Sequence, residues 1–256
     1  MSELSDQFRL DGKVAVVTGG SRGLGKEMVL GFARAGADVV IASRKFDACR
    51  AVADEVARST GRRALPVACH VGRWGDCDEL CDTVYREMGT VDVVVNNAGM
   101  SPLYVPDLRD VSEELWNKVI AVNLSGPFRL SALFGARMHA GSGGSIINIS
   151  SGAAVHATAG TLPYAAAKAG LHALTAGFAD AYGPNVRVNT IVAGRFLTDV
   201  SKSWDLEALR AELRRSQPLQ RPGEPYEIVG TALYLATAAS SYTTGAIIRV
   251  DGGAPI

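Results

Sequence analysis

The stretch "KVAVVTGGSRGLGKEM", residues 13–28, predicts a strand, a glycine-rich turn and the start of a helix in direct succession. Residues 13–18 are almost continuously apolar and rich in valine, a pattern typical of a strand buried on both faces of a sheet. A strand that leads through a turn into a helix is the repeating unit of parallel α/β folds. This stretch therefore predicts the class of fold.

The same alternation continues to the end of the chain. Apolar runs predict further strands at residues 37–43, 64–69, 91–97, 144–150, 186–192 and 246–250. Helices are predicted between them at about 23–36, 45–60, 74–88, 112–140, 162–182 and 224–238, with an additional helix near 204–215. This order implies an α/β fold with a doubly wound parallel sheet, right-handed crossovers and helices on both faces.

The sequence contains no long linker, internal repeat or low-complexity tract. Because 256 residues are enough to bury one full core, we predict a single domain over residues 1–256, with residues 1–9 as a flexible tail. The least regular stretches, 98–111 and 193–203, follow predicted strands. Ligand-binding loops of such sheets are found at these positions.

The charges balance, with 26 basic and 26 acidic residues and a formal net charge of zero. No strong field is therefore expected to attract nucleic acid or an anionic membrane. No apolar stretch reaches the length needed to cross a bilayer, and the N-terminus lacks the pattern of a secretion signal. We expect a soluble cytoplasmic protein with neither nucleic acid nor membrane as a partner.

Four cysteines offer a metal site as an alternative function. Cys77 and Cys81 share a helix face, and Cys69 is followed by His70. A Cys-x-x-x-Cys pair without a second close pair is weak evidence for a metal, however. We predict no metal site and reduced, partly buried thiols instead.

The glycine loop favours a dinucleotide. Gly19, Gly23 and Gly25 let backbone N–H groups approach a pyrophosphate at a helix N-terminus, where the helix dipole favours negative charge. Glycines also end strands for steric reasons alone, but the position between strand and helix supports cofactor binding. The predicted contacts in the loop are Gly19, Ser21, Arg22, Gly23, Leu24 and Gly25.

The end of the second strand bears on the choice of cofactor. An NAD site usually places a carboxylate there to bind the ribose 2′-hydroxyl. This chain has Ser43, Arg44 and Lys45 instead. Arg44 can pair with a 2′-phosphate, and Arg22 offers a second cation, so the sequence predicts NADP(H). The alternative is that both are ordinary surface arginines.

Six short motifs together resemble the short-chain dehydrogenase/reductase family, in its shorter single-domain, NADP(H)-preferring form. They are "TGGSRGLG", "NNAG" (96–99), Asn123 in "VNLSG", "INISS" (147–151), "YAAAK" (164–168) and "VDGG" (250–253), and they span about residues 10–253. The resemblance implies a Rossmann-type sheet of about seven parallel strands and a homotetramer or homodimer. It also implies hydride transfer between a nicotinamide and a carbonyl or alcohol, activity EC 1.1.1.-.

Four residues match the family's catalytic set. Tyr164 matches the general acid/base, Lys168 its partner, Ser151 the serine that orients the substrate oxygen, and Asn123 the asparagine that holds a water behind the lysine. Chemistry supports this choice, because a tyrosine pKa near 10 needs a nearby cation to favour the phenolate. Lys168 lies one helical turn from Tyr164, on the same face. Ser150 is not the serine we expect to react.

Other family positions complete the predicted cofactor contacts. Asn97, Ala98 and Gly99 are expected near the adenosine side or as ties between strands, and Gly194 and Thr198 near the nicotinamide. Some positions depart from the family pattern. His70 replaces the usual Asp before Val71, which accepts a hydrogen bond from the adenine amine. His70 and Val71 are predicted cofactor contacts: a neutral imidazole accepts or donates one bond there, or the adenine contact is lost. Ala193 replaces a proline before Gly194.

For several residues near the predicted substrate pocket, the sequence leaves two roles open. Arg195 faces either substrate or solvent, and His156 is either a pocket residue or a loop residue. His139 and His172 are expected in packing roles. The predicted apolar pocket is formed by segments 99–108, 152–163 and 194–216, with Met100, Pro102, Leu103, Tyr104, Phe196, Leu197 and Trp204 as its lining.

We therefore predict an NADP(H)-dependent carbonyl reductase that interconverts a hydrophobic ketone and a secondary alcohol. One alternative is a 3-oxoacyl-thioester reductase, in which Arg195 or Lys202 meets a phosphate of phosphopantetheine or coenzyme A. Another is a non-catalytic nucleotide-binding sensor or scaffold, which has no need of the complete Asn-Ser-Tyr-Lys set.

Overall fold

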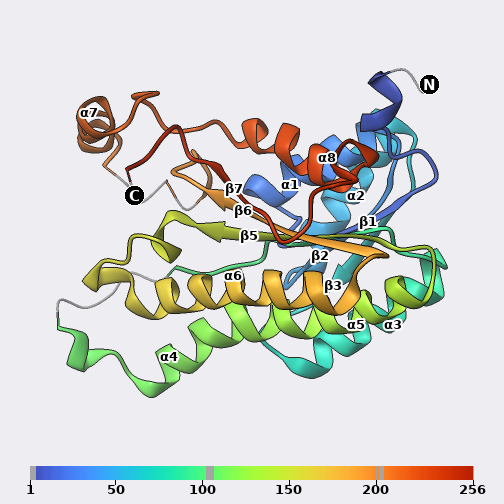
Figure 1. Ribbon diagram of the computed structural model, residues 1–256, viewed down its shortest axis with the longest axis horizontal. Helices are drawn as coiled ribbons and strands as arrows, with labels where there is room; N and C mark the ends of the chain where they lie inside the picture. The colour runs from blue at the N-terminus through green and yellow to red at the C-terminus, as the bar shows by residue number, and fades with distance from the viewer. Residues whose placement is uncertain (1–3, 102–106, 200, 202–204, 256) are drawn as a thin grey trace.

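The computed structural model describes residues 4–101, 107–199, 201 and 205–255. Seven parallel strands form one sheet in the order β3-β2-β1-β4-β5-β6-β7 (Figure 1). The strands are β1 (Val14–Thr18), β2 (Asp38–Ser43), β3 (Ala64–Ala68), β4 (Val93–Asn96), β5 (Gly144–Ser151), β6 (Val186–Ala193) and β7 (Ile247–Val250). The predicted α/β class and parallel sheet are confirmed.

Helices cover both faces of the sheet, as Figure 1 shows. They are α1 (Gly23–Arg34), α2 (Phe46–Thr60), α3 (Trp74–Met88), α4 (Glu113–Ile120), α5 (Gly126–Ala140), α6 (Leu162–Tyr182), α7 (Leu206–Ser216) and α8 (Val229–Ala236). On one face α1, α2 and α8 pack on the sheet around buried residues such as Phe32. On the other face α3, α5 and α6 pack around residues such as Phe134.

The predicted helix over 112–140 is not continuous. A π-helical turn, Ala121–Ser125, separates α4 from α5 and contains Asn123. The side-chain amide of Asn123 donates to the carbonyl oxygens of Val119 and Met100, both at 2.9 Å. Such wide turns are rare and frequently mark functional sites. Hydrophobic periodicity alone does not reveal the break, because the apolar face continues through it.

The same segment corrects a second prediction. Glu113–Ala140 is long and apolar enough by composition to cross a membrane, contrary to our reading that no stretch reaches that length. Half of its most apolar window is buried, however, and α5 packs against both α3 and α6. The buried half of the segment belongs to the core of the domain, as in the core helix of a folded protein.

The predicted N-terminal tail includes one short 3-10 helix, Leu4–Phe8, with no buried residue. The first buried side chain after it is Leu10. All four cysteines are buried with free thiols. The Cys77 thiol donates to the carbonyl oxygen of Val71, which fixes the start of α3 against the loop after β3.

A buried chain of polar side chains joins the central strands to α6. Asn96 in β4 donates to Asn148 in β5 at 2.9 Å, and Asn148 donates to Thr175 in α6 at 2.9 Å. Thr175 in turn bonds Thr190 in β6 at 2.7 Å. Because buried polar groups must be paired, this chain fixes how α6 sits on the sheet.

We expect Asn148→Ala to destabilise the fold by about 1–3 kcal/mol, because it removes partners from buried groups on both sides. Urea unfolding measures the change. The matched control Asn117→Ala, at an exposed position of α4, should stay within about 0.5 kcal/mol of the wild type. Equal effects of the two substitutions would show that the buried chain is not important for stability.

Candidate active site

The parallel register brings the ends of the central strands to one edge of the sheet. Thr18 at the end of β1 pairs with Ala42, and Ser151 at the end of β5 pairs with Ala193. The segments that follow these strands therefore meet at this edge. Ligands of open α/β sheets bind there, outside the carboxyl ends of the strands.

The glycine loop forms a tight cradle at the start of α1. Gly19 has a φ of 65° and Gly23 a φ of 54°, which favours glycine at both positions. A Cβ atom on Gly25 would lie 2.3 Å from the carbonyl oxygen of Gly19. Arg22 precedes the helix without capping it through its side chain. The first-turn N–H groups thus remain suitable for a phosphate.

The "NNAG" segment, residues 96–99, is bonded to this loop. The Asn97 side-chain amide donates to the carbonyl oxygens of Thr18 at 2.8 Å and Gly19 at 3.3 Å. The Thr18 hydroxyl accepts from the backbone N–H groups of Asn97 and Ala98. Of the two roles predicted for Asn97, the structure shows the tie between segments. We did not predict this role of Thr18, which binds the "NNAG" segment through both its hydroxyl and its carbonyl oxygen. Its position directly before the glycine loop could have indicated the role.

The residues after β2 lie beside the same loop, since the Gly19 N–H donates to the carbonyl oxygen of Ala42 at 2.7 Å. The Ser43 hydroxyl is 3.0 Å from the Cys49 sulfur. Arg44 is exposed and has no ion pair with any residue that the structure describes. Its guanidinium is therefore available to a ligand.

The geometry of His70 specifies its tautomer. Its Nδ1 atom accepts from the Gly72 N–H at 3.2 Å, so the neutral ring carries its proton on Nε2. The backbone N–H of His70 donates to Asp76 at 3.0 Å. His70 thus presents a hydrogen-bond donor where the resemblance implied an acceptor. Its neighbour Val71 is buried.

Tyr164 and Lys168 lie in the first turns of α6. The Lys168 ammonium group is 5.7 Å from the centroid of the Tyr164 ring and donates to the carbonyl oxygen of Ile149 at 2.7 Å. Lys168 is 3% exposed, and burial lowers its pKa to about 8. Of the intervening alanines, Ala165 and Ala167 are buried and Ala166 is exposed.

Asn123 approaches the lysine across Gly99. A Cβ atom on Gly99 would lie 3.0 Å from Asn123 Oδ1 and 3.7 Å from Lys168 Nζ. Asn123 Oδ1 also accepts from the Met100 N–H at 3.2 Å. A side chain at this position would crowd the Asn123 amide, so the small size of Gly99 suits the close approach.

The two serines at the end of β5 have different surroundings. The Ser151 hydroxyl accepts from the Ala153 N–H at 3.3 Å. Ser150 lies against α6 and its hydroxyl is 2.8 Å from His172 Nε2. Burial, and then the charge of Lys168, lower the pKa of His172. His172 therefore packs as a neutral side chain under the site.

The loop after β6 crosses the same edge. The Gly194 N–H donates to the carbonyl oxygen of Val250 at 3.0 Å. Thr198 lies over the glycine loop, because its Cβ is 3.5 Å from the position of a Cβ on Gly23. A cavity of about 410 Å³ opens there, lined by Gly23, Glu27, Leu197, Thr198, Asp199, Ser201, Leu206 and Pro225.

The predicted pocket lining is only partly described. Met100 and Phe196 pack against the two cores, although Phe196 also borders a small cavity with Arg195. His156 is exposed, and His139 bonds the carbonyl oxygen of Tyr182. The remaining positions, Pro102, Leu103, Tyr104, Lys202 and Trp204, lie outside the described residues.

The sequence matches the family described as enoyl-(acyl carrier protein) reductase over residues 19–255. A 3-oxoacyl-[acyl-carrier-protein] reductase from Chlamydia trachomatis is 37% identical over 242 residues, covering 94% of this chain and 96% of that protein.

Solved structures match equally well along the chain. A 7α-hydroxysteroid dehydrogenase with NADH and 7-oxo glycochenodeoxycholic acid gives a TM-score of 0.93 at 34% identity, covering 99% of this chain and 98% of that one. The L-sorbose reductase from Gluconobacter frateurii, with NADPH and L-sorbose, gives 0.90 at 28%, covering 97% and 98%. This protein belongs to the short-chain dehydrogenase/reductase family. It is an oxidoreductase of the alcohol–ketone type that uses a nicotinamide cofactor.

Burial of Lys168 predicts a dependence of stability on pH. Its pKa is about 8 in the folded protein and ordinarily 10.5, so the unfolded chain binds more protons between these values and stability rises with pH there. Below pH 8 the buried charge costs up to about 3 kcal/mol. Lys168→Met should therefore be more stable than the cofactor-free wild type at pH 7.

The gain should shrink as pH rises toward 10.5. Urea unfolding at several pH values measures it, with Lys118→Met, an exposed lysine of α4, as the matched control. A Lys168→Met variant with the same difference from wild type at every pH would contradict the lowered pKa.

Proposed function

We propose that this protein is an NADP(H)-dependent reductase that interconverts a ketone and a secondary alcohol through proton transfer by Tyr164. The observation that carries the proposal is the buried Lys168 ammonium group, which lies under the Tyr164 ring and close to Asn123. It also bonds the carbonyl oxygen of Ile149 in β5, the strand that ends with Ser151. A buried cation beside a phenol favours the phenolate, which is the state that a base at neutral pH needs.

The cradle fits the cofactor. Gly19, Gly23 and Gly25 leave room for a pyrophosphate at the uncapped N-terminus of α1, and Thr198 lies above them. Lys168 would hold the nicotinamide ribose, as the family resemblance implies. When bound, the nicotinamide supplies a hydride to the carbonyl carbon, or accepts one in the reverse direction.

The chain's own residues then transfer the proton that the substrate oxygen needs. The Tyr164 hydroxyl donates to the substrate oxygen as negative charge develops there, and the Ser151 hydroxyl donates a second hydrogen bond to the same oxygen. The charge of Lys168 would favour the phenolate of Tyr164, and by the family resemblance Asn123 would hold a water behind the lysine. With a pKa of about 8, Lys168 keeps its charge at neutral pH.

The choice of NADP(H) rests on Arg44. The site has an exposed arginine without a described carboxylate partner at the end of β2, and Arg22 is exposed in the adjoining loop. A guanidinium group favours a 2′-phosphate, and the absence of a carboxylate in "SRK" (43–45) leaves the 2′-hydroxyl of NAD without its usual acceptor. His70, a donor at Nε2, suits a ring nitrogen of adenine.

Two broader expectations belong to the same proposal. Exposed Trp116 on α4 and Phe128 on α5 favour a homotetramer or homodimer in which other subunits cover them. Balanced charge and buried free thiols suit the cytoplasm.

Tyr164→Phe should reduce kcat with NADPH and a ketone by at least about 100-fold, because the proton donor is lost while the ring stays. NADPH affinity, measured by fluorescence titration, should change less than threefold. Retained turnover in this variant would contradict the assigned role.

Arg44→Asp should lower kcat/KM for NADPH by about 100-fold and raise that for NADH, since a carboxylate repels the 2′-phosphate and accepts from the 2′-hydroxyl. The matched control Arg50→Asp changes the same charge on the exposed surface of α2, near Asp47. A preference of the wild type for NADH, or equal effects of both substitutions, would overturn the NADP(H) assignment.

A 3-oxoacyl-thioester reductase is the second candidate, favoured by the 37% identity to the Chlamydia enzyme. NADPH oxidation with a panel of ketones and acetoacetyl thioesters separates the two candidates.

A further inference from the structure

The segment Gly194–Thr198 crosses the site from the reacting serine to the glycine loop. It begins after Ala193, the strand partner of Ser151, and it ends with Thr198 above Gly23. Arg195 lies between these two points. Arg195 is the only charged residue of the segment that joins β6 to Thr198, and its side chain extends to Glu212 in α7.

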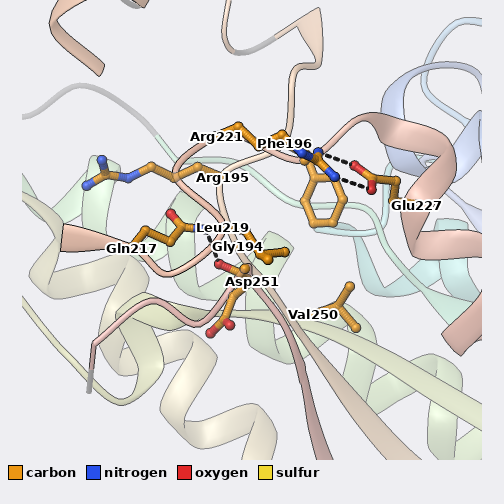
Figure 2. Close-up of a pocket in the computed structure, with 11 residues that line it drawn as sticks. Gly194, Arg195, Phe196, Gln217, Leu219, Arg221, Glu227, Val250 and Asp251 are labelled. Atoms are coloured by element: carbon orange, nitrogen blue, oxygen red, sulfur yellow. Dashed lines mark hydrogen bonds and ion pairs between the residues drawn. The ribbon is translucent and has the colours of Figure 1, made fainter. Parts of the chain in front are cut away.

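Two arginines border a small cavity at this edge, and Figure 2 shows Arg221 paired with Glu227 while the Arg195 side chain extends away from that pair. Arg221 is fully engaged: it makes two bonds of 2.7 Å to the carboxylate of Glu227 and one of 3.1 Å to the carbonyl oxygen of Pro222. Arg221 holds the pKa of Glu227 at about 2. This pair is part of the frame of the site.

The guanidinium group of Arg195 has one polar partner among the described residues, an ion pair of 2.9 Å between its Nη1 and Glu212 Oε2 in α7. The two side chains are 46% and 51% exposed. Exposed pairs of this kind contribute about 0–1 kcal/mol, so a competing anion can replace Glu212 at little cost. A displaced Glu212 still has the charge of Arg215 nearby, one turn along α7.

We propose that Arg195 binds an anionic group of the substrate, a carboxylate or a phosphate, which displaces Glu212. This deepens the proposed function and rests on it: the substrates are ketones or alcohols with an anionic end. Arginine binds such groups bidentately, which fixes the orientation of the substrate as well as its affinity. An uncharged substrate that covered Arg195 would instead bury a cation whose best partner is the weakly held Glu212.

The cavity agrees with this assignment. Its volume is about 80 Å³, the space of several water molecules, and Phe196 and Leu219 form apolar walls. A small charged group with a short apolar stem fits better than a ring system.

The experiment compares matched charged and uncharged substrates with NADPH. One arm uses 4-oxopentanoate, 5-oxohexanoate and 6-oxoheptanoate against their methyl esters. The other uses acetoacetyl-coenzyme A against acetoacetyl-N-acetylcysteamine. A charge preference only in the first arm identifies a carboxylate, and only in the second a phosphate. The variants are Arg195→Met, Arg195→Lys and Glu212→Gln, with Arg214→Met on α7 as the control.

We expect the wild type to prefer the charged member of one arm at least tenfold in kcat/KM. Arg195→Met should lower kcat/KM at least tenfold for that member and much less for its uncharged analogue, mainly through KM. Arg195→Lys should retain part of the preference, Glu212→Gln should increase it, and Arg214→Met should leave it intact.

The inference is overturned if neither arm shows a preference, or if the preference survives Arg195→Met; reduction of the uncharged ketones by NADPH would then still support the proposed function. If no compound is reduced, the proposed function fails, and binding decides the inference. In that case glutarate and pyrophosphate should raise the Tm of the NADPH complex of the wild type but not of Arg195→Met. Equal shifts, or none, would refute it.

Discussion

The site depends on keeping one ammonium group, that of Lys168, out of water. A lysine that is 3% exposed gains little from solvent, and its one described hydrogen bond goes to the carbonyl oxygen of Ile149. Such a group is unfavourable for stability and persists only where the surrounding structure fixes it. The rigid attachment of α6 to β5 through Asn148 and Thr175 meets that need, because it holds the helix and the carbonyl oxygen in one frame.

The same frame explains the π-helical turn. A regular helix through residues 112–140 would place Asn123 at another angle. With the wide turn, its amide donates to Val119 and Met100, and its oxygen points toward Gly99 and Lys168. Backbone irregularity is thus located where it brings a polar group to the buried cation. The loops at the edge of the sheet depend in turn on this arrangement, since Met100 connects Asn123 to the segment after β4.

The sequence predicts the fold because its local signals agree with one another. The strands are continuous apolar runs, the helices fill the intervals, and the glycine loop lies at the first junction, so these signals predict a doubly wound parallel sheet. The spacing of Tyr164 and Lys168 likewise fixes their proximity, since helical periodicity is a local property. Two features are not local. The break at 121–125 includes a hydrogen bond from Asn123 to Met100, and the partner of Arg195 follows from the packing of α7. Periodicity and spacing contain no information on such contacts.

Two arginines beside the cofactor cradle lack a carboxylate partner among the described residues, although Glu27 and Asp199 line the cavity there. Many arginines of this protein have a carboxylate partner, as Arg50 has Asp47 and Arg129 has Asp78. At the edge where the strands end, Arg22 and Arg44 have no carboxylate partner among the described residues. Arg195 has an exposed partner there, Glu212. A zero net charge excludes steering of ligands over long distances, but charges within about one Debye length of the cradle still act on them. The edge is thus suited to a ligand with several phosphates, and a substrate with its own negative charge would benefit from the same field.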